Sequence, residues 1–174
     1  MKATTKSNHK DVKPVADYFI SLLETQNGDM MSNLKLQKLC YLAQGWYVAR
    51  YDEVLFDNDI QAWALGPVVV DLYYELRRNK KNYESLSSAD ITTKPYNMFS
   101  KKQKEFLEAI WFKYGVVLAS QLVMLTHRHK PWIDAYRPDI PPRHKRCDKV
   151  ITIESMKSFF RGLDEKAMKH KKKQ

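Results

Sequence analysis

Apolar residues recur every three or four positions from Val12 onward, which is the spacing of one buried helix face. Pro14 falls in the first turn, where a missing N–H costs little. Asn27 and Gly28 form a typical helix stop. The pattern therefore predicts a helix from Val12 to about Asn27. Residues 1–10 are polar, and we expect them to form a flexible N-terminus.

A second helix is predicted from Asn33 to about Tyr51, with Ser32 as its N-cap. Its apolar residues cover most of the helix circumference, and its polar residues are scattered instead of gathered on one side. A helix that is apolar nearly all round is normally buried. We therefore expect this segment to be the central helix of the domain.

The next segment carries the signals of a β-hairpin. Two short β-prone runs, 54–56 and 60–64, flank the acidic stretch 57–59, which predicts a hairpin that turns there. Gly66 and Pro67 follow, and proline is favoured in the first turn of a helix. We therefore expect a helix from Val68 to Asn79.

The second half of the chain is predicted to be helical after a long loop at 80–99. Ser100 and Gln103 form a capping-box pattern that opens a helix closed by Gly115. Residues 116–126 are predicted to form another buried helix. Pro131 and Trp132 begin a short helical turn, and the prolines at 138, 141 and 142 interrupt regular structure. Thr152 can cap a last helix, whose expected inward residues are Ile153, Met156, Phe159 and Phe160.

These elements predict a mainly α fold: a single compact helical domain over residues 11–165 with a small β-hairpin. The chain has 174 residues, of which 44% are hydrophobic and 12% aromatic, so it can fill one core. No run approaches the roughly 20 apolar residues of a membrane span, and no secretory signal is evident. Cys40 and Cys147 form no disulfide framework, and we expect Cys40 to fill the core. We expect a cytoplasmic protein.

The net charge of +10 is concentrated at the C-terminus. Residues 143–174 contain 11 Lys/Arg and 4 Asp/Glu, whereas the preceding 142 residues are nearly balanced. Residues 166–174 are predicted to be a basic flexible tail. Such a tail either is simply solvated or binds nucleic acid or an acidic partner. The run from Lys169 to Lys173 has no aromatic or arginine with which to read a base.

One cluster could carry chemistry: His127 and His129, with Asp134 and His144 downstream. Two histidines could act as general acid and base in RNA cleavage, or bind a metal with Asp134. Yet residues two apart point about 200° apart on a helix. The simpler interpretation is that His127 bonds a helix-end carbonyl. No glycine-rich phosphate loop or nucleophile elbow occurs, so we expect no catalytic site, metal or cofactor.

Three segments resemble the Panacea domain, the family of SocA-like antitoxins and phage-associated GepA proteins. The first is residues 34–46, with the sequence LKLQKLCYLAQGW. The second is the Leu-Phe pair at 55–56, followed by IQAWALGPV at 60–68 and a tyrosine at 73 or 74. The third is the Thr-His pair at 126–127 with Pro-Trp at 131–132. The motif positions are Leu36, Leu39, Tyr41, Gln44, Trp46, Phe56, Trp63, Gly66, Pro67, His127, Pro131 and Trp132.

The resemblance implies an antitoxin that neutralises a neighbouring toxin by direct protein binding. It also allows an adaptor role in which the toxin is delivered to a protease. It supplies no catalytic residues and does not identify the toxin. The alternatives that remain are a nucleic-acid-binding regulator that uses the basic C-terminus and a ribonuclease that depends on His127 and His129.

Binding energy at protein interfaces concentrates in a few Trp, Tyr and Arg anchors. Near Pro67 the chain supplies five such residues as candidates for toxin contact: Trp63, Tyr73, Tyr74, Arg77 and Arg78. Each tyrosine precedes an arginine by four positions, so each pair shares a helix face. One pair could face the core edge and the other a partner. The alternative is that both tyrosines are core residues and both arginines are merely solvated.

Overall fold

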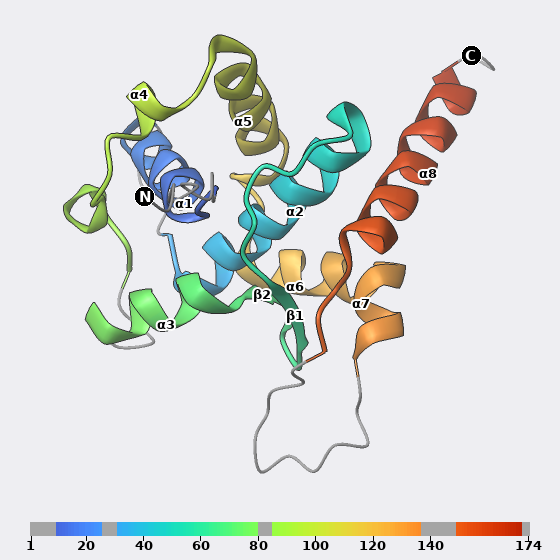
Figure 1. Cartoon of the computed structure of the whole chain (residues 1–174), viewed down its shortest axis with the longest axis horizontal. Helices are drawn as coiled ribbons and strands as arrows, with labels where there is room; N and C mark the ends of the chain where they lie inside the picture. Colours follow the sequence, from blue (N-terminus) through green and yellow to red (C-terminus); the bar gives the residue numbers. More distant parts are fainter. Residues whose placement is uncertain (1–9, 26–30, 80–84, 137–148, 172–174) are drawn as a thin grey trace, which may run out of the picture.

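Helix α2, Asn33–Tyr51, crosses the middle of the computed structural model (Figure 1). It packs against α1 (Lys13–Ser21), α3 (Val70–Asn79), α5 (Lys101–Tyr114), α6 (Ala119–His127), α8 (Ile153–Lys171) and strand β2 (Gly66–Val69). The structure describes residues 10–25, 31–79, 85–136 and 149–171. The Ser32 hydroxyl caps α2 by accepting a hydrogen bond from the Lys35 N–H at 3.1 Å. The predicted central helix is therefore confirmed, together with its cap.

The described residues form eight α-helices and one two-stranded antiparallel sheet, so the predicted mainly α class with a minor β element is confirmed. Within the described residues, no single helix is both long and apolar enough to cross a bilayer. Helices α5 and α6 meet that test only as a pair, and they are bent by 100° to one another. Cys40 is buried, as expected of a core residue, and Cys147 lies outside the described residues.

The hairpin differs from the predicted one. Strands β1, Ile60–Trp63, and β2, Gly66–Val69, pair with Ile60 opposite Val69 and turn at residues 64–65. The predicted pairing of 54–56 with 60–64 is wrong, because buried Gln44 binds the main chain of 55–56 instead. The predicted helix start at Val68 is also wrong. Pro67 lies in β2, and α3 spans Val70–Asn79.

A further segment borders the other side of β1. The Ala62 N–H donates to the Lys149 carbonyl at 3.0 Å, and the Ile151 N–H donates to the Ile60 carbonyl at 2.7 Å. These bonds fix the start of α8, Ile153–Lys171, beside the hairpin. Thr152 caps α8 as predicted, since its hydroxyl accepts the Ser155 N–H at 3.2 Å.

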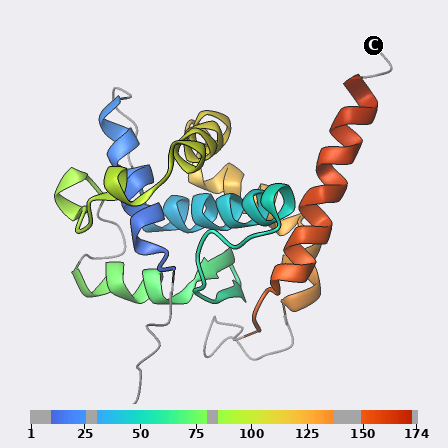
Figure 2. The ribbon, with the colours of Figure 1, turned by 45° about the horizontal axis from the view of Figure 1, so that its top comes forward.

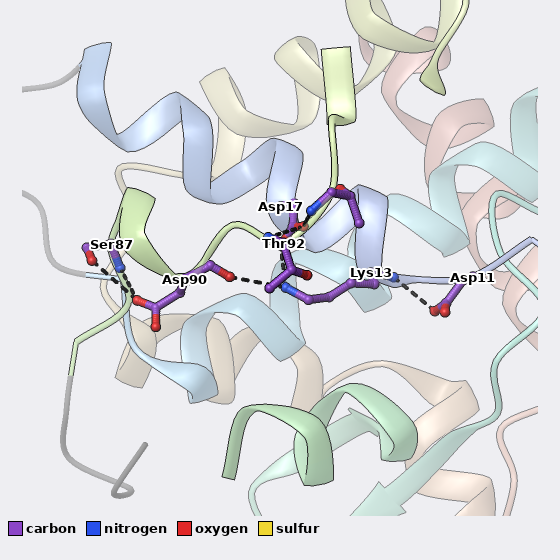
Figure 3. Close-up of polar contacts among 7 residues, drawn as sticks. Asp11, Lys13, Asp17, Ser87, Asp90 and Thr92 are labelled. Atoms are coloured by element: carbon purple, nitrogen blue, oxygen red, sulfur yellow. Dashed lines mark hydrogen bonds and ion pairs between the residues drawn. The ribbon is translucent and has the colours of Figure 1, made fainter. Parts of the chain in front are cut away.

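A buried ion pair fastens α1 to the loop before α4 (Figure 3). Helix α1 spans Lys13–Ser21 and continues as a 3₁₀ turn, Leu22–Thr25; the expected stop at 27–28 lies outside the described residues. Within α1, the Lys13 ammonium pairs with Asp17. The second Asp17 oxygen accepts the N–H groups of Thr92 and Thr93 at 3.0 and 2.8 Å. Lys13 also donates to the Asp90 carbonyl at 3.3 Å.

This anchored segment is the stretch that was predicted to be a loop. It contains a 3₁₀ turn, Ser88–Asp90, and the short helix α4, Pro95–Met98. At the start of the described residues, the Lys10 N–H donates to the Asp57 carboxylate at 2.7 Å. Residues 1–9 lie outside the described residues.

Helix α5, Lys101–Tyr114, begins at the predicted capping box and ends at Gly115. Helix α6, Ala119–His127, starts three residues later than predicted and is not a buried helix, because only Leu122 and Thr126 on it are buried. Apolar side chains of the segment predicted to be buried are instead exposed, among them Val116, Leu118 and Met124. Helix α7, Lys130–Ala135, is the predicted short turn. The prolines at 138, 141 and 142 lie outside the described residues.

The first half of α8 packs against α2. Met156 and Phe160 are fully buried, whereas Ile153 and Phe159 are only partly buried. Gly45 permits this packing, since a Cβ there would lie 2.1 Å from the Phe160 ring. The second half projects beyond the body (Figure 2). The tail expected at 166–174 therefore begins as helix, which continues to Lys171.

Removing residues 166–174 should leave the fold intact, because the described side chains from Lys166 to Lys169 are exposed. Exposed substitutions away from special features usually change stability by less than about 0.5 kcal/mol. We therefore expect the melting temperature to change by no more than about 2 °C. Thermal denaturation followed by circular dichroism measures this; a loss of cooperative unfolding would show that the end of α8 packs on the body.

Candidate functional site

Three buried polar side chains of α2 bind the main chain of the hairpin region. The Gln44 amide donates to the Phe56 carbonyl at 2.7 Å and accepts the Leu55 N–H at 2.8 Å. Gln37 accepts the Val69 N–H at 2.8 Å. The Lys38 amino group donates to the Pro67 carbonyl at 2.9 Å. Because an unpaired buried polar group costs about 1–3 kcal/mol, these bonds fix where residues 55–69 lie.

The start of β2, at Gly66 and Pro67, lies directly over Lys38. Gly66 has φ of 98°, a conformation that favours glycine. A Cβ at this position would lie 2.9 Å from Lys38 Cε and 2.9 Å from Thr126 Oγ1. Thr126 is held in turn by its hydrogen bond to the Leu122 carbonyl at 2.9 Å. The Gly-Pro and Thr-His motifs therefore meet at one lysine.

Trp132 connects this cluster to the hairpin. Its indole N–H donates to the Trp63 carbonyl at 3.0 Å. Its ring stacks on His127 at 4.2 Å between centroids and on Tyr136 at 4.6 Å. Burial and the nearby charge of Lys38 lower the pKa of His127. His127 thus serves as a packing partner of Trp132.

His129 points into a different environment. Its Nδ1 lies 3.3 Å from the Tyr41 hydroxyl, and its ring packs 5.4 Å from that of Phe160. Burial lowers the pKa of His129 to about 4, so this side chain is neutral at physiological pH. Asp134 lies at the surface in an ion pair with Lys130 at 2.8 Å.

The structure therefore does not assemble the cluster that the sequence suggested as a ribonuclease or metal site. Among the described residues, no group of three or more His, Cys, Asp or Glu is placed to hold a metal ion. His144 lies outside the described residues. His127 was expected to bond a helix-end carbonyl; it interacts instead with the backbone of Ala64, which lies in the turn between β1 and β2.

The five candidate contact residues form one surface, here called the α3 surface: Trp63, Tyr73, Tyr74, Arg77 and Arg78. The Trp63 ring is nearly buried and lies edge-on to Tyr73 at 4.8 Å and to Tyr74 at 6.4 Å. Arg77 donates to the Tyr73 hydroxyl at 3.0 Å. Tyr74 is 42% exposed, and both arginines are exposed. Neither tyrosine is therefore a core residue.

A shallow depression of about 550 Å³ lies on this surface. It is lined by Asp71, Tyr74, Glu75, Arg77 and Arg78. Tyr73 and Arg77 bond one another beside Trp63. Arg77 also lines the depression, together with Tyr74 and Arg78, so the two tyrosine–arginine pairs are not cleanly divided between two faces. The lining therefore offers one aromatic ring, two cations and two carboxylates to a partner.

The remaining motif residues lie in the core. Trp46 is partly buried, and its indole N–H donates to the Tyr114 hydroxyl at 3.0 Å. The other positions are buried: Leu36, Leu39, Tyr41, Gln44, Phe56, Pro131 and Trp132. The sequence analysis missed Gln37 and Lys38 as functional parts of the fold. For Gln37 the available signal was its seven-residue spacing from Gln44, which places both amides on one helix face, whereas no such signal marked Lys38.

Lys38 should make stability depend on pH. Burial lowers its pKa from 10.5 to about 7. Between these values the unfolded chain binds a proton that the folded chain does not, so stability rises with pH from about 7 upward. The free energy of unfolding should increase by up to about 1.4 kcal/mol per pH unit relative to Lys38→Met. Chemical denaturation at pH 6–10 measures the difference.

The exposed Lys101→Met substitution is the control for this experiment. The Lys38→Met variant also loses the hydrogen bond to the Pro67 carbonyl. This loss lowers its free energy of unfolding by the same amount at every pH, so it does not change the slope of stability against pH. If the free energies of unfolding of wild type and Lys38→Met differ by a constant amount across the pH range, the buried Lys38 side chain is not a neutral amine.

Gly66→Ala should destabilise the protein by about 1–3 kcal/mol, because alanine is strained at positive φ. Its Cβ would also press on Lys38 and Thr126. The matched control is Gly162→Ala, since a Cβ there meets nothing within 4 Å. Melting temperatures of the two variants should move in opposite directions. Equal changes in melting temperature for the two variants would mean that position 66 tolerates a side chain.

Two comparisons with known proteins agree with this arrangement. The family model "Antitoxin SocA-like, Panacea domain" matches residues 36–133, a segment that contains Lys38, the hairpin, α3 and Trp132. Antitoxin SocA of Caulobacter vibrioides (strain NA1000 / CB15N) is 31% identical over 133 residues, covering 70% of this chain and 70% of that protein. No solved structure matches significantly. These matches support an antitoxin role and confirm the resemblance: the chain belongs to the SocA-like antitoxin family with a Panacea domain.

Proposed function

We propose that this protein is a cytoplasmic antitoxin that neutralises its cognate toxin by direct binding, with the α3 surface as the contact. The observation that carries the proposal is the combination of a fixed aromatic cluster with exposed arginines on one helix. Trp63 is held through its carbonyl by Trp132 and through its indole by Gln61 at 2.9 Å. The cluster therefore loses little side-chain entropy when a partner covers it.

The chemistry of the α3 surface suits a protein partner. Tyr74 offers an exposed ring and a hydroxyl, and aromatic anchors surrounded by polar groups are typical of binding hot spots. Arg77 and Arg78 can each bind a carboxylate with two parallel hydrogen bonds. Asp71 and Glu75 lie among them, so the surface selects a partner with both kinds of charge.

The proposed mechanism has no catalytic step. Both histidines that could have acted as acid and base are instead packed against aromatic rings, His127 on Trp132 and His129 beside Phe159 and Phe160. Binding alone is also what an adaptor would need to present a toxin to a protease, which we include as a second use of the same complex.

Co-expression with the protein encoded by the adjacent gene tests this function. Arg77→Glu combined with Arg78→Glu should keep the fold by circular dichroism, because both side chains are exposed. It should fail to restore growth and should not co-purify with the toxin, since each change replaces a cation with an anion at the contact. We expect at least a tenfold loss of affinity, as for truncation of interface charge pairs.

Lys94→Glu combined with Lys101→Glu is the matched control, because it changes the net charge equally at two exposed positions on other elements. It should restore growth like the wild type. Normal rescue by the arginine variant would exclude the α3 surface as the contact. Loss of rescue in His127→Ala with His129→Ala, with fold and toxin binding intact, would show that the protein acts by catalysis.

A further inference from the structure

Two lysines of α5 lie over aromatic side chains of α2. Lys102 and Lys113 are about three helical turns apart, which places them on one face of α5. The Lys102 ammonium lies 3.9 Å from the centre of the Tyr51 ring, and the Lys113 ammonium lies 4.8 Å from that of the Trp46 ring. Arg50 of α2 also approaches the Tyr51 ring, at 5.5 Å. Three cations are therefore held along the seam between the two helices.

The aromatic rings under these cations are fixed by packing. Phe106, which is buried, lies 5.8 Å from Tyr51. Trp46 donates to the Tyr114 hydroxyl at 3.0 Å, and its ring packs 5.1 Å from that of Phe160 on α8. Because these rings are held from several sides, the cations that rest on them lose less conformational entropy when a partner binds.

The positive charge of the three side chains is not compensated. Within the described part of the chain, Arg50, Lys102 and Lys113 form no ion pair, and all three are exposed. Arg50 and Lys102 approach the same ring, so two like charges lie close together. The nearby Asp52 carboxylate is bound by Arg161 of α8 at 3.3 Å. Since like charges repel, an anion placed beside both cations is stabilised. The arrangement therefore favours an anionic ligand.

The area between the two lysines offers apolar contacts. Ala109 is exposed and lies on the same face of α5, seven residues after Lys102 and four before Lys113. Trp46 is only partly buried, so part of its ring is accessible beside α5. We name this region the α2–α5 surface and define it by six residues: Trp46, Arg50, Tyr51, Lys102, Ala109 and Lys113.

We propose that the α2–α5 surface binds an acidic peptide segment of a partner protein, in which carboxylates flank an apolar side chain. The cations receive the carboxylates, and Ala109 and the accessible part of Trp46 receive the apolar group. Arginine and tryptophan beside one another are typical of the anchors that dominate protein interfaces. Charge complementarity of this kind increases both the rate and the specificity of association.

A nucleic-acid strand matches this surface less well. Bases stack on open aromatic faces, whereas lysines lie over the rings of Tyr51 and Trp46. Asp52 and Glu53 are exposed at the end of α2, where they repel a continuous phosphate backbone. A peptide can instead place a neutral or basic residue opposite these two carboxylates.

The α2–α5 surface is separate from the α3 surface. Figures 1 and 2 show α5 and α3 on opposite sides of α2. The inference therefore goes beyond the toxin contact proposed above, and its test does not require the toxin. Arg77→Glu with Arg78→Glu should leave binding at the α2–α5 surface unchanged, because distant sites act independently.

The test uses a labelled peptide of about twelve residues in which single leucines separate pairs of glutamates. Its affinity for the full chain is measured by fluorescence polarisation at 50 and 200 mM salt. We expect at least tenfold tighter binding than for the same peptide with glutamine in place of glutamate, and weaker binding at the higher salt. Lys102→Glu with Lys113→Glu should weaken binding at least tenfold. Lys102→Arg with Lys113→Arg should bind like the wild type, because both charges are kept.

Ala109 provides a second test in which no existing contact is removed. Ala109→Lys adds a cation between the two lysines and should tighten peptide binding about two- to fivefold, whereas Ala109→Asp should weaken it by a similar factor. Both variants should keep the fold by circular dichroism, because Ala109 is exposed. A change of the same sign in both variants would contradict recognition by charge.

Lys94→Glu with Lys101→Glu is again the control for net charge, since Lys101 lies on α5 but pairs with Glu105 at 3.9 Å. Equal weakening by this control, or peptide binding that does not depend on Lys102 and Lys113, would overturn the site while leaving the antitoxin function standing. Tighter binding of a single-stranded oligonucleotide of the same length, dependent on the same two lysines, would assign the surface to nucleic acid instead.

Discussion

The fold depends on hydrogen bonds from buried polar side chains of α2 to the main chain of residues 55–69. Gln44 matches the peptide groups of Leu55 and Phe56 as both donor and acceptor, and Gln37 and Lys38 bind β2. A short hairpin has little stability of its own. These side chains supply the partners that its backbone needs in a dry interior, and they determine its position on α2.

The position of the hairpin then decides the position of the surface. Gly66 closes over Lys38 and Thr126, and Trp132 bonds the Trp63 carbonyl at the end of β1. Trp63 in turn packs against Tyr73 of α3. A chain of direct contacts therefore runs from a buried lysine to the exposed tyrosine–arginine helix. This dependence explains how residues in the core can set the geometry of the α3 surface.

The α3 surface combines an aromatic cluster held by packing with charges of both signs. A surface whose side chains are already held in place limits the entropy lost on binding.

The sequence by itself determined the helices with strong caps and periodicity: α2 after Ser32, α5 after Ser100 and α8 after Thr152. It also determined the family, because the motif spacing is specific. Only the tertiary structure decided the register of the hairpin, since buried Gln44 competes for the strand predicted at 54–56. The tertiary structure also decided the surroundings of His127 and His129, which are two residues apart in sequence but pack against different aromatic rings. Local propensity fixes helices through neighbouring residues, whereas these outcomes depend on long-range contacts that no local pattern encodes.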